Sequence, residues 1–170
     1  VQHLQPDPQS RKARQLEELV FSLKQYPGVL SYVETLVQTN KIKNTALSDI
    51  LETTPRFVLT GVSGSGKTTA LCRTALNIAQ EALSGLDYQQ KSIPTPFVLY
   101  FSEWRVGQSL KNFLQEQWPY AGDAFETIAK SNIYFFGDGL DELRGDISKK
   151  IDELHHWLNG GMGPYRAIIT

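Results

Sequence analysis

The chain has 170 residues, 41% of them hydrophobic, which suits one domain with a single packed core. Its formal charge of -1 gives no reason to expect a general attraction to nucleic acid or to an anionic membrane, and its apolar runs are far shorter than the ~20 residues that a membrane helix needs. Cys72 is the only cysteine, which excludes an internal disulfide and a cysteine-rich metal site. We therefore expect a soluble protein of a reducing, cytoplasmic compartment.

Residues 1–44 are predicted to form an N-terminal helical segment and a linker. Apolar residues recur at helical spacing between residues 11 and 26, until Pro27 and Gly28 interrupt the pattern. A second segment of this kind at residues 29–37 fades into the polar stretch 38–44, which is the candidate linker. The chain opens with Val1 rather than methionine, and we expect it to be a piece of a longer protein.

Residues 45–170 are predicted to alternate between helices and strands. A short helix capped by Thr45 ends before Pro55, and the apolar run at residues 56–60 suits a strand covered on both faces. A long helix follows from residue 67 to about residue 83, where Gly85 is expected to end it. The later helices are expected at residues 110–118, 123–129 and 147–158, the last with Ile147, Ile151, Leu154 and Leu158 as its apolar residues, and the later strands at 96–101, 133–136 and 167–170. This alternation predicts an α/β fold, a parallel sheet with helices on both faces.

A phosphate-binding loop is predicted between the first strand and the long helix. The sequence Gly61-Val62-Ser63-Gly64-Ser65-Gly66-Lys67-Thr68 fits the pattern G-x-x-x-x-G-K-[ST] at every fixed position. Glycines let successive backbone N–H groups turn inward around phosphate oxygens, and the following helix directs its positive end at them. Lys67 adds a full charge toward the β- and γ-phosphates, and the Thr68 hydroxyl is a candidate magnesium ligand. Thr69 is counted with the nucleotide-binding residues without a specific role.

An acidic segment is predicted to complete the site. Asp138 closes the strand that begins at residue 133, and in a parallel sheet the carboxyl ends of strands face the ligand crevice. We therefore expect Asp138 to hold the magnesium ion from the sheet side. Asp141 and Glu142 follow closely enough for one of them to polarise the attacking water, and the sequence does not decide which. Together these residues predict a site that binds ATP or ADP with Mg2+.

The segment Asp138-Gly139-Leu140-Asp141-Glu142 resembles the signature of NACHT-type NTPases, which belong to the STAND class of signal-transducing ATPases. The resemblance covers about residues 45–170, including the phosphate loop and Ser102-Glu103-Trp104. It implies a P-loop NTPase three-layer sandwich with the ASCE strand order, in which the fourth strand lies between the phosphate-loop strand and the strand of Asp138. It also implies a slow ATP-driven switch in immune, cell-death or defence signalling that self-associates or works with partner domains.

The resemblance stops at the end of the chain. In the family a sensor arginine, a fifth strand, a helical lid and a winged-helix domain follow the position of Thr170, and this sequence ends there. We therefore expect a truncated domain with a nucleotide pocket open on one side and weak hydrolysis.

Three alternative functions are considered. A GTPase would show a guanine-reading N-K-x-D segment after the Asp138 strand, and the sequence has none there. A small-molecule kinase would share the phosphate loop but usually lacks an acidic pair placed like Asp141-Glu142. A scaffold that binds ATP or ADP without hydrolysing it stays open, because the same residues would serve it.

Overall fold

The computed structural model describes residues 7–26, 47–87, 92–161, 163, 164 and 166–170. The expected helical segment at residues 29–37, the linker at 38–44 and the cap at Thr45 lie outside the described residues. The domain boundary between residues 44 and 45 therefore stays a prediction. Within the described part of the chain, no helix is both long and apolar enough to cross a membrane.

The described strands form one parallel sheet in the order β1-β4-β3-β2. β4 lies between β1, which leads into the phosphate loop, and β3, which ends at Asp138. This confirms the expected α/β fold and its ASCE strand order. The strands are β1 (Arg56–Val58), β2 (Thr95–Tyr100), β3 (Ile133–Asp138) and β4 (Arg166–Ile169).

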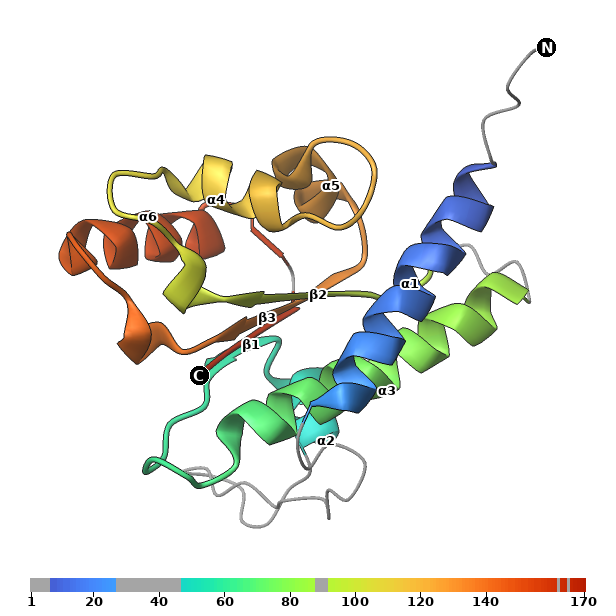
Figure 1. The fold of residues 1–170 in the computed structure, drawn as a ribbon, viewed down its shortest axis with the longest axis horizontal. Helices are drawn as coiled ribbons and strands as arrows, with labels where there is room; N and C mark the ends of the chain where they lie inside the picture. The colour runs from blue at the N-terminus through green and yellow to red at the C-terminus, as the bar shows by residue number, and fades with distance from the viewer. Residues whose placement is uncertain (1–6, 27–46, 88–91, 162, 165) are drawn as a thin grey trace.

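Helices cover both faces of the sheet and make a three-layer sandwich (Figure 1). One layer holds α1 (Pro8–Gln25), α2 (Leu47–Thr53) and α3 (Lys67–Asp87). The other holds α4 (Leu110–Gln117), α5 (Ala124–Lys130) and α6 (Ile147–Asn159). Two 3-10 turns follow strands, η1 (Phe101–Glu103) directly after β2 and η2 (Leu140–Glu142) one residue after β3.

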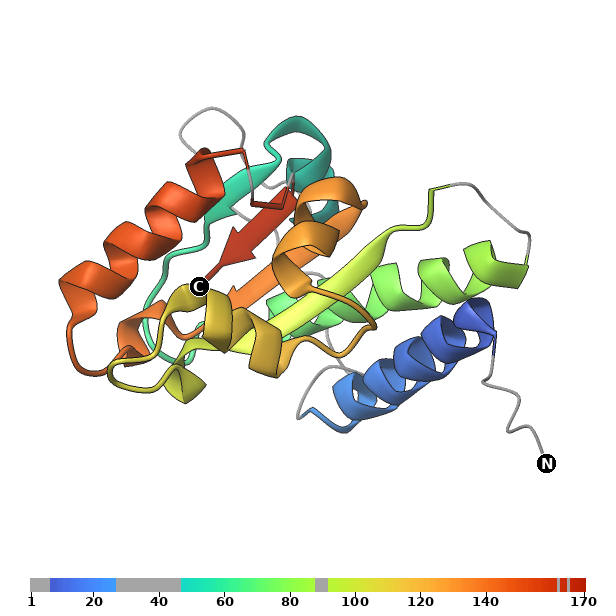
Figure 2. The ribbon, with the colours of Figure 1, turned by 90° about the horizontal axis from the view of Figure 1, so that it is seen from above.

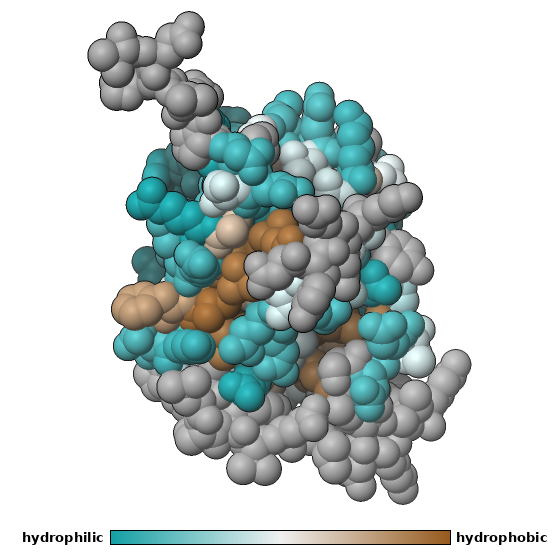
Figure 3. Space-filling model, turned by 90° about the vertical axis from the view of Figure 1, so that its right-hand side faces the viewer, coloured by the Kyte–Doolittle hydropathy of each residue, from teal (hydrophilic) through white to brown (hydrophobic). Residues whose placement is uncertain are grey.

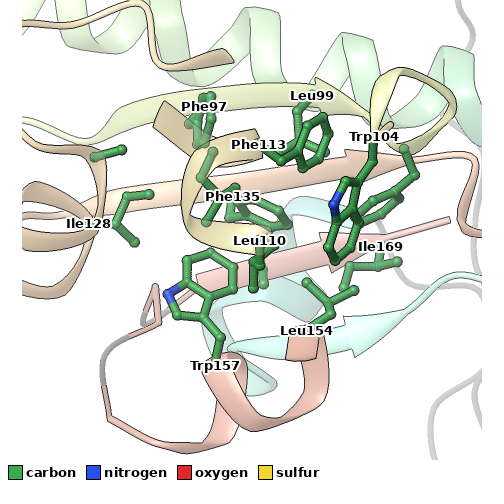
Figure 4. Packing of buried hydrophobic residues seen from close by; sticks show 14 of the residues in the cluster. Phe97, Leu99, Trp104, Leu110, Phe113, Ile128, Phe135, Leu154, Trp157 and Ile169 are labelled. Carbon is green, nitrogen blue, oxygen red and sulfur yellow. The ribbon is translucent and has the colours of Figure 1, made fainter. Parts of the chain in front are cut away.

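The core beneath α4, α5 and α6 is rich in aromatic side chains (Figure 4). Trp104 stacks on Phe113 with ring centroids 5.3 Å apart, and Phe135 meets Trp157 edge to face at 5.3 Å. Trp104, Trp118 and Trp157 are 1%, 8% and 4% exposed. The tryptophans therefore pack in the core, where such ring pairs add to the free energy gained by burying their area.

The opposite core is built from α1 and α3, which lie side by side (Figure 2). The predicted stripe of α1 is buried there through Leu16, Val20 and Leu23. In this core α3 contributes small buried residues such as Ala75 and Ala79, which let neighbouring elements come close. Apolar side chains also reach the surface on this side of the molecule (Figure 3).

Two predicted boundaries are wrong. β1 ends at Val58. It is an edge strand of the described sheet and pairs only with β4, so Val58 is 56% exposed rather than covered on both faces. α3 continues through Gly85 to Asp87. A glycine inside a helix costs about 1 kcal/mol relative to alanine. Ala82 and Gly85 are both buried, so packing of this end of α3 offsets the cost and Gly85 does not end the helix.

The buried face of α6 also differs from the prediction. Ile147 and Ile151 are 46% and 42% exposed, and the face turned to the core is formed by Lys150, Leu154 and Trp157. Lys150 can be buried because its Nζ donates hydrogen bonds to the carbonyl oxygens of Trp104 and Arg144. It also lies 5.1 Å from the centroid of the Trp104 ring, so a cation–π contact adds to the hydrogen bonds.

Candidate functional site

The phosphate loop joins β1 to α3, as predicted. Gly64 and Gly66 have φ angles of 78° and 84°, a backbone conformation that favours glycine. Lys67 begins α3, and its Nζ donates to the carbonyl oxygens of Gly61 and Val62 at 2.9 and 3.2 Å. The ammonium group is therefore held over the loop that precedes it, at the positive end of a 21-residue helix.

Asp138 faces this loop from the end of β3. Its side chain is only 9% exposed, and its Oδ1 accepts a hydrogen bond from Thr68 Oγ1 at 3.0 Å. A second hydroxyl, Thr170 Oγ1, donates to the same carboxylate oxygen. The two residues predicted to serve magnesium are thus in direct contact, although 70 positions separate them in the chain.

The loop and the acidic segment line one pocket of about 380 Å³. From the loop side Gly61 and residues 63–69 contribute to the lining, and from the acidic segment Asp138, Asp141 and Glu142 do. Val62 does not line the pocket and is 79% exposed, so of the predicted nucleotide-binding residues it alone lies outside the lining. Lys67 is the only basic side chain among the described lining residues.

The acidic pair lies in the tight turn η2, one residue after β3. Gly139 has a φ of 73°, and a Cβ at this position would come within 3.1 Å of Glu142 Cδ. The Glu142 amide donates to the Gly139 carbonyl at 2.9 Å, which closes the turn. Asp141 and Glu142 are both exposed and both line the pocket, so each of the two carboxylates is a candidate for positioning water.

Thr170 is a site residue that sequence reasoning missed. Besides its hydroxyl contact to Asp138, its amide donates to the Gly137 carbonyl at 2.9 Å, and its carbonyl accepts from the Leu140 amide at 2.7 Å. It therefore holds both ends of the turn that carries the acidic pair. Its place at the carboxyl end of β4 was the available signal, because the carboxyl ends of parallel strands share one edge of the sheet.

We predict that Thr170→Val lowers the free energy of unfolding by about 1–3 kcal/mol, because it leaves the buried Asp138 carboxylate with one hydroxyl donor fewer. A chain of this size should then melt roughly 2–12 °C lower, at 2–4 °C per kcal/mol. Thermal denaturation followed by circular dichroism measures the shift, and Thr53→Val, at an exposed position of α2, is the control. An unchanged melting temperature for Thr170→Val would show that the contact does not stabilise the fold.

A second layer of side chains lies behind the site. Tyr26 follows α1 and packs against the α3 core, near the side chain of Thr68. Cys72, one turn further along α3, is fully buried, and burial raises the pKa of its thiol to about 11. Cys72 is therefore a packing residue and stays protonated at neutral pH.

The oxygen atoms of Thr68 and Asp138 fit a magnesium ion. Mg2+ prefers hard oxygen ligands and is usually held by one or two protein groups together with phosphates and water. No group of three or more His, Cys, Asp or Glu side chains among the described residues could hold a metal without such help. Thr68 and Asp138 are therefore the residues that would hold magnesium delivered with a nucleotide.

Comparison with known families decides what kind of domain this geometry belongs to. The model of the NACHT domain matches residues 56–164, well over half of the chain. The chain belongs to the NACHT family. No curated protein matches it. Membership means that this NACHT domain is a P-loop domain of the nucleoside triphosphatase type that operates in signalling proteins.

Proposed function

We propose that this NACHT domain binds ATP together with Mg2+, hydrolyses it slowly, and acts as a nucleotide-controlled switch in a larger signalling or defence protein. The observation that carries the proposal is the contact between Thr68 and Asp138 at the mouth of the phosphate loop. This contact joins the loop and the acidic segment into one site.

The phosphates would lie along residues 63–69, where inward N–H groups and the positive end of α3 favour anions. Lys67 now donates to two carbonyl oxygens of the loop, which are neutral acceptors. Phosphate oxygens are charged and accept stronger hydrogen bonds, so we expect the ammonium group to turn to the β- and γ-phosphates when a nucleotide binds.

ATP is favoured over GTP because the sequence after β3 has no guanine-reading N-K-x-D segment. ADP would occupy the same loop, since the loop grips phosphates rather than the base. Magnesium, when bound, neutralises charge between the β- and γ-phosphates, and the roles of Thr68 and Asp138 are to hold it and to orient one another.

Hydrolysis is expected to be slow because little charge faces the departing γ-phosphoryl group. Lys67 is the only basic side chain among the described residues that line the pocket. A missing arginine in such sites lowers the rate by roughly 10³–10⁵-fold. The carboxylate that orients water must then come from Asp141 or Glu142, which line the same pocket.

We expect either Asp141→Asn or Glu142→Gln to lower single-turnover hydrolysis by roughly 10²–10⁴-fold, the usual contribution of a general base. Both variants should bind ATP within a few-fold of the parent, because neither residue is assigned to the phosphates. Asp152→Asn, on the exposed side of α6, is the matched control. Parental rates in both variants would show that neither carboxylate positions the water, whereas no hydrolysis by the parent itself would favour the non-hydrolysing scaffold.

The proximity of Tyr26 to Thr68 supports a switch. Thr68 is the proposed magnesium ligand and Tyr26 lies at the end of α1, so a change at the metal site can alter the packing of the helix that precedes the domain. We expect partner domains of the full-length protein, or further copies of that protein, to respond to this switch. We place its action in the cytoplasm.

If the switch operates through Tyr26, hydrogen exchange of the last turn of α1 should differ between the Mg2+–ATP and Mg2+–ADP states. Tyr26→Phe should abolish that difference while leaving exchange in α6 unchanged, because the phenyl ring keeps its packing and only the hydroxyl near Thr68 is lost. Identical exchange in both nucleotide states of the parent would argue against α1 as the responding element.

A further inference from the structure

A second pocket lies at the opposite edge of the sheet from the phosphate loop. It has a volume of about 490 Å³, within the usual range for small-molecule sites. Its floor is formed by the amino ends of β2 and β3, at Thr95 and Ile133, whereas the phosphate loop faces the carboxyl ends. It is therefore separate from the nucleotide site.

The walls of this second pocket come from elements far apart in the sequence. α1 forms one wall, and the loop between α4 and α5 approaches it from the other side of the gap (Figure 2). α1 contributes Arg11, Lys12 and Gln15, and the end of α5 contributes Lys130. The N-terminal helix thus completes a pocket on the NACHT domain.

The charge of the pocket is positive. Arg11, Lys12 and Lys130 line it, and no Asp or Glu does so among the described lining residues. Lys130 pairs with Glu126 at 3.3 Å, but both side chains are at least 70% exposed, so solvent screens that pair. Burial lowers the pKa of Lys12, as expected for an ammonium group drawn partly out of water.

One side of the pocket is aromatic and held in place. Trp118 is 8% exposed and meets Tyr120 edge to face, with ring centroids 5.1 Å apart. The Tyr120 hydroxyl donates to the Pro96 carbonyl oxygen at 2.7 Å, which ties the loop between α4 and α5 to β2. The wall is therefore already ordered before a ligand binds, so no binding free energy is lost in ordering it.

We propose that this pocket binds a small organic anion that has a flat apolar body and a phosphate or carboxylate head. The aromatic wall accepts the body, and the basic side chains of α1 and α5 accept the head. Neither feature alone selects this class, since a bare anion leaves the wall uncovered and a neutral aromatic leaves the positive charge of the pocket without a counter-charge from the ligand. A ligand here bridges α1 to the sheet, so its site is distinct from the nucleotide site in place and in chemistry.

The probe for this proposal is 1-naphthyl phosphate, compared with 1-naphthol and inorganic phosphate. Binding is followed by the indole N–H signal of Trp118 in two-dimensional NMR, because the chain has three tryptophans and Trp118→Phe assigns the signal. We expect 1-naphthyl phosphate to bind at least about tenfold more tightly than either half-probe, since each loses one of the two interactions.

Two variants test the pocket in different ways. Lys12→Glu reverses a charge, and Ala121→Trp, at an exposed lining position, fills the space; each should weaken 1-naphthyl phosphate by about tenfold or more. Lys24→Glu, an exposed residue near the other end of α1, and Lys67→Ala in the phosphate loop should leave it within about twofold.

Three results would overturn the proposal. The first is loss of binding in Lys67→Ala with retention in Lys12→Glu, which would place the probe in the phosphate loop. The second is equal affinity for 1-naphthyl phosphate and 1-naphthol, which would leave the basic residues without a role. The third is an unmoved Trp118 signal in the folded parent chain at millimolar probe.

Discussion

Replacing Lys67 by alanine should weaken ATP binding by roughly 10²–10⁴-fold. The expected contacts are two charge-assisted hydrogen bonds, to the β- and γ-phosphates, each worth about 1.5–3 kcal/mol. A sum of roughly 3–6 kcal/mol corresponds to that loss in affinity. Isothermal titration calorimetry measures it, with Lys149→Ala on the exposed side of α6 as the control.

The fold should survive this substitution. Among the described residues, Lys67 Nζ donates hydrogen bonds only to two carbonyl oxygens of the exposed loop, and water can replace it there. The melting temperature of Lys67→Ala is therefore expected to lie close to that of the parent. If a folded Lys67→Ala chain bound ATP within a few-fold of the parent, the assignment of the phosphate loop would be wrong.

Asp138→Asn should weaken the magnesium-dependent part of nucleotide binding on the order of 10–100-fold, the range for residues that hold a metal ligand in place. Asp138 accepts from Thr68 Oγ1, and its charge attracts the metal. An asparagine oxygen can still accept that hydrogen bond, so the geometry is kept and the charge is lost. Binding without magnesium should change little, since Asp138 has no proposed contact to the phosphates.

The comparison is made by titrating ATP in Mg2+ and again in EDTA, for the parent, Asp138→Asn and Asp146→Asn. Asp146 is an exposed aspartate that caps α6, so it controls for loss of a charge outside the pocket. Equal losses in both conditions for Asp138→Asn would count against a magnesium role and in favour of a general structural one.

The fold could be predicted largely from local patterns. Strand and helix signals around residues 56–60, 67–83 and 133–136 predicted the parallel sheet, and the segment at 138–142 predicted the NACHT family, which the family match confirms. The failures came from tertiary packing. Gly85 stays helical because packing buries this end of α3, and Lys150 displaces Ile147 from the buried face of α6 because two carbonyl groups accept from it.

The candidate site likewise combines residues that local patterns predict with residues that only the folded chain brings together. The residues of the loop motif and of the acidic segment are recognised in the sequence by their spacing, and the structure brings both into one pocket. Thr170 and Tyr26 have no such motif. Their positions next to Asp138 and Thr68 depend on where β4 and α1 lie in the folded chain, which no local pattern encodes. Their roles, like those of the predicted residues, are proposals that the substitutions above test.

Magnesium-dependent binding of ATP is tested by a titration of the purified chain with labelled ATP, ADP and GTP, each with and without Mg2+. We expect ATP and ADP to bind, GTP to bind more weakly, and Mg2+ to strengthen ATP binding in the parent but not in Asp138→Asn. Absence of ATP binding by the folded parent chain, or ATP binding indifferent both to Mg2+ and to Lys67→Ala, would contradict the proposed function.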